Sequence, residues 1–119
     1  MKMTLSEVYE MVGGEYQNVL ERLDDKETVE NFVLRFLDDS SYVQLLQYLQ
    51  AGDLKRAFYA AHTLKGISQS LGFSRLGECV ETMCRELRKG AEPSEIILHQ
   101  LKTEFHCVIT VIKDFKDSL

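Results

Sequence analysis

Tryptophan is absent from this chain, and proline occurs once, at Pro93, among 119 residues. So little proline favours long helices, because proline removes a backbone donor and kinks a helix interior. The three cysteines are an odd number, and none forms a C-x-x-C pair. We therefore expect neither a zinc site nor a disulfide framework, and we expect the chain to lie in a reducing cytoplasm.

Long apolar runs and basic clusters are also missing. No stretch approaches the roughly 20 apolar residues that cross a bilayer, and the first residues lack the apolar core of a secretion signal. Acidic residues outnumber basic ones by 19 to 14 and the basic ones are dispersed, so nucleic acid is a poor candidate partner. No phosphate-binding glycine loop or serine nucleophile motif is present, and we expect no ATP binding.

Apolar residues instead recur at spacings of three and four along most of the chain, which is typical of amphipathic helices. Two short helices are expected before residue 25, the first opened by a capping box from Thr4 to Glu7 and ended by Gly13. A bent helix or two abutting helices are expected over residues 26–50. Their shared seam is predicted to consist of Val29, Phe32, Phe36, Val43 and Leu46.

Capping residues predict where the longer helices begin and end. Asp24 is the expected cap of the segment 26–50, and Ser40 could start a new helix within it. Asp53 and Gly72 bound the next helix. A further helix is expected from Ser74 to Gly90, and a last one with Pro93 in its first turn and Phe115 near its end.

Four long amphipathic helices with short links favour an all-α, antiparallel up-down four-helix bundle. We assign residues 25–119 to this bundle and residues 1–24 to short N-terminal flanking helices, within a single domain overall. If the apolar stripes fill one bundle, no apolar face is left for a dimer. We therefore expect a monomer.

His62 is the most informative residue of the chain, because Lys65 follows three positions later and Gly66 four positions later. Positions i+3 and i+4 adjoin position i on a helix, so Lys65 lies beside the imidazole and Gly66 leaves bare backbone next to it. The seam predicted to be buried lies elsewhere on this helix, at Leu54, Ala57, Ala61, Leu64, Ser68 and Leu71. Glycine inside a helix costs roughly 1 kcal/mol relative to alanine, so the open space suggests that a large partner approaches the ring.

Other side chains are predicted to surround His62 on the outward half of the helix and to bind the same partner as Gly66. These are Lys55, Phe58, Tyr59 and Gln69. Further candidate chemistry is thin. His99 and His106 lie two helical turns, roughly 10 Å, apart and are interpreted as partly solvated side chains rather than metal ligands.

Residues 62–72 (HTLKGISQSLG) resemble the central motif of histidine-containing phosphotransfer (HPt) domains. The resemblance covers roughly residues 15–117 and continues through Leu76, Cys79, Glu81, Arg88 and Gly90. It implies a phosphocarrier of two-component signalling, without ATP-dependent kinase activity of its own. His62 would take a phosphoryl group from the aspartyl phosphate of a response-regulator receiver domain, or of a hybrid sensor kinase, and pass it to another receiver.

In this interpretation Lys65 supplies positive charge to the phosphate oxygens. Magnesium is expected in the partner receiver and not in this chain, which offers no carboxylate cluster near His62. One position departs from the family. Many members carry a glutamine on the next helix that hydrogen-bonds the phosphoacceptor ring, and that place falls near Met83, Cys84 and Arg85.

Two alternatives stay open at this point. The chain could be an adaptor that binds receivers or other proteins without carrying phosphate, which the missing glutamine favours. It could also be a ligand- or metal-binding bundle, although Ser68 is the only polar residue on the seam of the His62 helix. The starting methionine and the complete bundle favour a standalone protein over a segment of a hybrid kinase.

Overall fold

The computed structural model describes residues 2–119, and most of them are helical. The elements in chain order are α1 (Leu5–Val12), α2 (Tyr16–Leu23), α3 (Lys26–Arg35), the 3-10 helix η1 (Phe36–Asp38), α4 (Ser41–Gln50), α5 (Leu54–Ser70), α6 (Ser74–Arg88) and α7 (Glu95–Ser118). No strand forms between residues 2 and 119, so the all-α prediction is confirmed.

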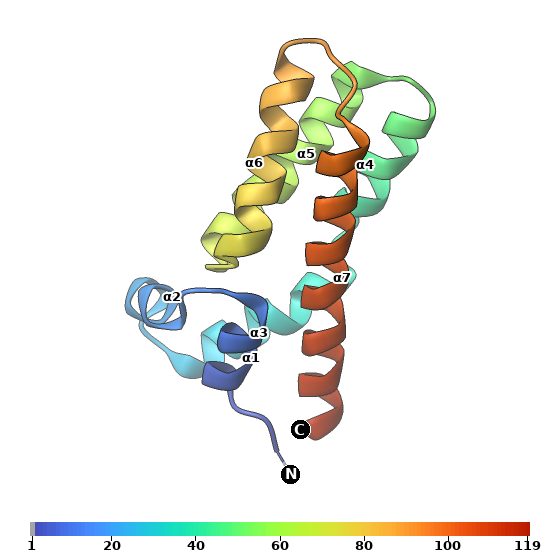
Figure 1. Cartoon of the computed structure of the whole chain (residues 1–119). Coiled ribbons are helices and arrows are strands. Elements are labelled where there is room, and N and C mark those ends of the chain that lie inside the picture. The colour runs from blue at the N-terminus through green and yellow to red at the C-terminus, as the bar shows by residue number, and fades with distance from the viewer. Residues whose placement is uncertain (1) are drawn as a thin grey trace.

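Helices α4 to α7 form the predicted up-down bundle. In Figure 1, α4 and α6 run toward one end of the molecule and α5 and α7 run back. α5 packs against both α4 and α6, and α6 packs against α7. α7 has 24 residues and continues beyond the other three helices, where it contacts α1 and α3.

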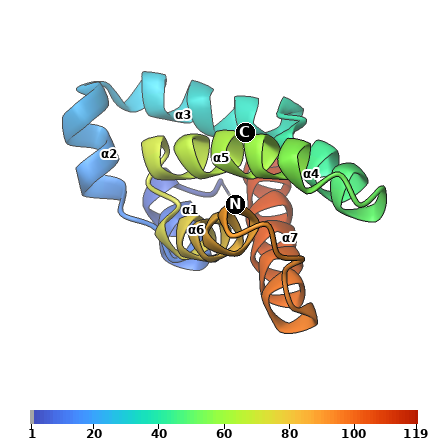
Figure 2. The ribbon, with the colours of Figure 1, turned by 90° about the horizontal axis from the view of Figure 1, so that it is seen from above.

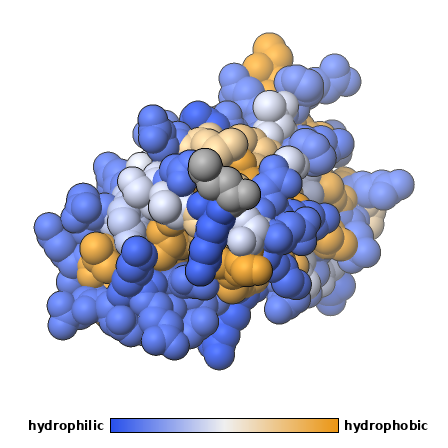
Figure 3. Space-filling model, turned by 90° about the horizontal axis from the view of Figure 1, so that it is seen from below, coloured by the Kyte–Doolittle hydropathy of each residue, from blue (hydrophilic) through white to orange (hydrophobic). Residues whose placement is uncertain are grey.

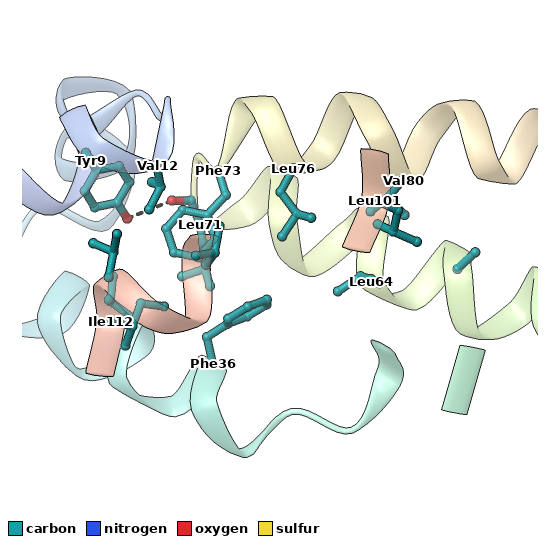
Figure 4. Packing of buried hydrophobic residues seen from close by; sticks show 14 of the residues in the cluster. Tyr9, Val12, Phe36, Leu64, Leu71, Phe73, Leu76, Val80, Leu101 and Ile112 are labelled. Carbon is teal, nitrogen blue, oxygen red and sulfur yellow. Dashed lines mark hydrogen bonds between the residues drawn. The ribbon is translucent and has the colours of Figure 1, made fainter. Parts of the chain in front are cut away.

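One hydrophobic core joins the bundle to the N-terminal helices. Figure 4 shows the side chains that meet between α5, α6 and α7, which are those of Leu64, Leu76, Val80 and Leu101. A second group lies at the base of the bundle and consists of Tyr9, Phe36, Phe73 and Ile112. The surface at the end of α7 is mostly hydrophilic, with apolar residues in small separate patches (Figure 3).

The corner between α1 and α2 is tied to the turn between α5 and α6. The Tyr9 hydroxyl donates to the carbonyl of Leu71 at 2.7 Å, and the backbone amide of Glu15 donates to the carbonyl of Gly72 at 2.9 Å. Gly72 has φ +69°, and a Cβ there would lie 2.2 Å from Val19. Only glycine therefore fits this close approach.

Residues 26–50 form two helices with a break, which decides between the two forms that the sequence left open. Asp39 is extended, and its carboxylate accepts from the backbone amide of Ser41 at 3.0 Å and from the Ser41 hydroxyl. Ser40 occupies the N-cap position of α4, but its side chain makes no capping bond.

The single apolar seam predicted through this segment is wrong in part. Phe32 is 42% exposed and Val43 is 53% exposed, whereas Val33 and Leu45 are buried. Within α3 the buried row continues from Val29 through Val33, which leaves Phe32 at its edge. The 3-10 turn and the break before α4 then change which side of the chain faces the core, so the helical period does not continue to Val43.

The sequence predicted Asp24 as the cap of α3, and this prediction is wrong. Asp24 ends α2 in the left-handed region, with φ 59°, a conformation that aspartate tolerates better than most residues. The cap of α3 is Asp25, whose side chain accepts from the backbone amide of Glu27 at 3.4 Å and from the Thr28 hydroxyl at 2.8 Å.

Two other helices begin at positions different from those predicted. Ser74 is the first residue of α6, the N-cap position belongs to Phe73, and no side chain caps this end. Pro93 precedes α7, and Ser94 caps the helix by accepting from the backbone amide of Ile97 at 3.2 Å. The helix begins after Ser94 because the serine hydroxyl can accept a hydrogen bond from a free amide of the first turn.

Candidate functional site

α5 carries His62, and its two ends and its seam are as predicted. The Asp53 carboxylate accepts from the backbone amide of Arg56 at 3.1 Å, and left-handed Gly72 follows the last turn. The seam is buried at Ala57, Ala61, Leu64, Ser68 and Leu71, and Leu54 is half-buried. Because the core holds this face of the helix, the opposite face is directed outward.

His62 and Gly66 lie on the outward face. Both are exposed, and Lys65 is half-buried beside them. Apart from the two flanking residues and the backbone of α5 itself, no atom lies within 4 Å of the position that a Cβ on Gly66 would occupy. The space next to the imidazole is therefore open to an approaching molecule.

The imidazole contacts an aromatic side chain one helical turn earlier. The ring centroids of Phe58 and His62 are 6.0 Å apart and their planes meet at 29°. The His62 ring makes no hydrogen bond to another residue in the described range 2–119. The neighbour of the imidazole is thus the apolar ring of Phe58 and not a polar side chain.

Arg88 of α6 reaches over the other member of this pair. Its guanidinium carbon lies 5.5 Å from the centroid of the Phe58 ring. A cation at this distance from an aromatic ring is attracted to its face, by about 0.5–1 kcal/mol at exposed sites. The sequence placed Arg88 only within the family resemblance, and contact with Phe58 could not be found from spacing because the two residues lie on different helices.

The α6 positions where the family carries glutamine hold no such polar partner. Met83 and Cys84 are buried, and Arg85 is exposed. Burial raises the pKa of the Cys84 thiol, and the positive charges of Lys65 and Arg88 oppose this rise. Lys65 of α5 and Arg88 of α6 are thus both close enough to influence the Cys84 thiol.

A groove of about 650 Å³ lies on the other side of His62. Its lining residues come mainly from α2, α3, η1 and α5, and Figure 2 shows α3 running beside α5 with α2 near the end of α5. The lining residues are Arg22, Leu23, Phe32, Arg35, Phe36, Asp39, His62, Thr63, Gly66, Ile67, Ser70 and Leu71. The open space at Gly66 is thus part of a larger hollow beside the imidazole.

Two arginines and an exposed aromatic ring line this groove, and the sequence analysis missed all three. Arg22 donates to the carbonyl of Ser70 at 2.8 Å and so holds α2 against the end of α5. The Arg35 guanidinium carbon lies 6.0 Å from the centroid of Phe32. The predicted seam had placed Phe32 in the core, which concealed the groove.

The charges around His62 are positive and lack carboxylate partners. The ion pairs between residues 2 and 119 involve Arg56, Arg75 and Lys89, so Lys65, Arg88 and the groove arginines form none. Among the described residues that line the groove, Asp39 is the one acid. A chain of net charge −5 therefore presents a locally basic surface at its exposed histidine.

The remaining predicted partner-binding residues are accessible. Lys55, Tyr59 and Gln69 are exposed along the outward face of α5, and Phe58 is half-buried. His99 and His106 are exposed on α7. No group of three His, Cys, Asp or Glu side chains is arranged as metal ligands within residues 2–119.

The model of the family described as "Hpt domain" matches residues 15–109, which span α2 to the middle of α7. No curated protein and no solved structure matches the chain significantly. In the part of the chain that the structure describes, none of the helices has the length and apolar character to span a membrane.

Proposed function

The chain belongs to the Hpt domain family, and we propose on this basis that it is a phosphorelay carrier of two-component signalling with His62 as its phosphoacceptor. The observation that carries the proposal is the exposed His62 beside the open space at Gly66, within a surface of unpaired cations. A histidine that only stabilised the fold would not need such an approach.

The proposed transfer is an in-line displacement at phosphorus. A ring nitrogen of neutral His62 attacks the aspartyl phosphate of a receiver domain, and the N–P bond forms as the O–P bond to the receiver's carboxylate breaks. The released carboxylate leaves as an anion, and His62 holds the group as a phosphoramidate. Attack by the aspartate of a second receiver reverses these steps and returns His62 to its starting state.

Lys65 is the residue of this chain proposed to neutralise the phosphate oxygens. Phosphoryl transfer depends mostly on positioning and charge neutralisation, and the half-buried Lys65 stands one turn from His62. We propose that the receiver brings the magnesium ion. In this proposal the chain has no ATP-dependent kinase activity of its own.

The receiver is proposed to dock across the outward face of α5 and the groove beside it. Gly66 would admit the receiver's active site, and the exposed side chains of Tyr59, Lys55 and Gln69 would contact its rim, whereas the half-buried Phe58 packs beside His62. The groove adds Phe32 as an apolar contact, along with two arginines that suit an acidic partner. The hybrid sensor kinase and the response regulators of one pathway are the proposed partners, in the cytoplasm, where the three free thiols fit a reducing environment.

The direct test is to incubate the protein with a phosphorylated receiver domain and to look for an adduct on this chain. The expected adduct is labile in acid and stable in base, as a phosphohistidine is. Its absence, together with measurable receiver binding, would favour the second candidate, an adaptor that docks receivers without carrying phosphate. The observation that favours this alternative is that the His62 ring has an aromatic neighbour, Phe58, but no hydrogen-bonding partner among residues 2–119.

A further inference from the structure

The His62 ring is touched by an aromatic side chain where a hydrogen-bonding partner is missing, and this bears on how the nucleophile is presented. We propose that Phe58, held by Arg88, is the positioning residue that sets the orientation of the His62 ring. This inference rests on the proposed carrier function, since orientation matters only if a ring nitrogen must attack.

The contact between the two rings limits how the imidazole can turn. Phe58 is one helical turn before His62, and the angle of 29° between their planes is a stacked arrangement rather than an edge contact. On the following turn Gly66 has no side chain to restrict the ring. Phe58 is therefore the side chain on α5 best placed to favour one rotamer of His62.

Arg88 connects this pair to the rest of the bundle. Phe58 and His62 share a helix, so their contact alone does not fix either ring relative to α6. Arg88 lies in the last turn of α6 and places its guanidinium over the Phe58 ring. Because it forms no ion pair within residues 2–119, no carboxylate there competes for its charge.

The neighbouring α6 positions explain why a different device is needed here. Cys84 faces the core with 1% of its surface exposed, and a thiol is at best a weak donor. Arg88 follows Cys84 by one turn on the same side of α6. α6 thus reaches the phosphoacceptor through an arginine and an aromatic ring instead of through a hydrogen bond.

Orientation and docking have different kinetic signatures. A ring that samples several rotamers places its attacking nitrogen in line for only part of the time, which lowers the rate of transfer within the complex. It does not change how tightly the receiver binds. The maximal rate and the half-saturating receiver concentration therefore separate a positioning role of Phe58 from a docking role.

The experiment measures phosphoryl transfer from one phosphorylated receiver at increasing receiver concentration. For Phe58→Leu we expect a maximal rate lower by about tenfold, since misplacement of reacting groups is costly, and a half-saturating concentration within about twofold of the parent. Arg88→Gln should lower the maximal rate in the same direction. Phe58→Tyr and Arg88→Lys keep the ring and the cation, and should restore it.

Arg85→Gln is the matched control, because it removes an exposed α6 charge that does not lie over Phe58. Arg88 is exposed as well, so Arg88→Gln is expected to fold. A raised half-saturating concentration at an unchanged maximal rate would overturn the inference and leave Phe58 as a docking residue. Equal losses in Arg85→Gln and Arg88→Gln would also overturn the part assigned to Arg88.

Nuclear magnetic resonance gives a readout that does not depend on phosphate. The two Hα–Hβ couplings of His62 should differ in the parent, as in a single rotamer, and should approach one another in Phe58→Leu. Averaged couplings in the parent would contradict the inference even if the parent carries phosphate. If instead the couplings differ and no phosphate is taken up, the carrier function fails and the positioning contact stands.

Discussion

The Tyr9 hydroxyl donates a hydrogen bond of 2.7 Å to the carbonyl oxygen of Leu71, across 62 positions of sequence. This bond joins α1 to the end of the helix that carries His62. Burial raises the pKa of Tyr9 above its ordinary value, so the hydroxyl stays protonated and continues to donate even in alkaline solution where an exposed tyrosine ionises. The position of α5 thus depends in part on a residue near the N-terminus of the chain.

Tyr9→Phe should lower the free energy of unfolding by about 1 kcal/mol, because the bond is buried and the Leu71 carbonyl loses its donor. Tyr16→Phe is the matched control, since its ring centroid lies 5.4 Å from that of Tyr9 in a tilted arrangement while its hydroxyl makes no hydrogen bond within residues 2–119. Urea denaturation of both variants measures the difference. Equal losses in the two would show that the Tyr9 bond does not stabilise the corner.

Two glycines of the α5–α6 junction should respond in opposite ways to alanine. A Cβ at Gly77 would lie 3.8 Å from Ser68 and Gln69, an ordinary contact, so Gly77→Ala should stabilise the protein by about 0.5–1 kcal/mol through helix propensity. Gly72→Ala should destabilise it by more than about 1–2 kcal/mol, since it adds a clash with Val19 to a left-handed φ of +69°. A neutral Gly72→Ala would contradict the close approach.

Gly66 separates the structural from the functional reason for a glycine. Gly66→Ala and Gly66→Gln should both raise the free energy of unfolding by about 0.5–1 kcal/mol, because the position is helical and open. Gly66→Gln should nevertheless lose phosphoryl uptake from a receiver by steric obstruction, and Gly66→Ala should lose less. Thermal melting and uptake are measured on the same samples.

Two results at Gly66 would each contradict one inference, either that a partner closes over this position or that the position is open. A stabilised and fully active Gly66→Gln variant would mean that no partner closes over this part of α5. A destabilised variant would mean that a neighbouring element packs at this position. That result would contradict the open space that the structure has there.

The local features of α5 could be read from the sequence, because they arise within one helix. Asp53, Gly72 and the spacing of Ala57, Ala61 and Leu64 predicted its ends and its buried face, and the exposure of His62 followed from them. The capping box at Thr4 was equally local and is present, with the Glu7 amide donating to the Thr4 hydroxyl at 3.1 Å.

The groove and the aromatic contact could not be read in the same way, because they are made between elements. Arg22 and Phe32 line the groove only because α2 and α3 pack beside α5. Arg88 meets Phe58 only when α6 has packed on α5. No spacing along the chain encodes these distances, and the assumption of one continuous seam turned Phe32 to the wrong side.

Lys65→Ala should slow phosphoryl transfer by roughly tenfold without abolishing it, because a charge-assisted contact to phosphate contributes about 1.5 kcal/mol and the receiver adds other charges. Lys113→Ala, which removes an exposed cation of α7, serves as the control. Stopped-flow or quench measurements at several salt concentrations report the rate. Identical rates for Lys65→Ala and the parent at every salt concentration would make Lys65 a bystander.

Phosphoryl uptake by the His62→Gln variant is the decisive measurement of whether His62 is the phosphoacceptor. The substitution lies on the exposed face of α5, so helicity and the melting temperature should stay close to those of the parent. The free energy of unfolding should change by no more than about 0.5 kcal/mol. We expect the parent to acquire an acid-labile, base-stable phosphoryl group from a phosphorylated receiver and the folded variant to acquire none. Uptake by the variant, or its unfolding, would contradict the assignment of His62 as the phosphoacceptor.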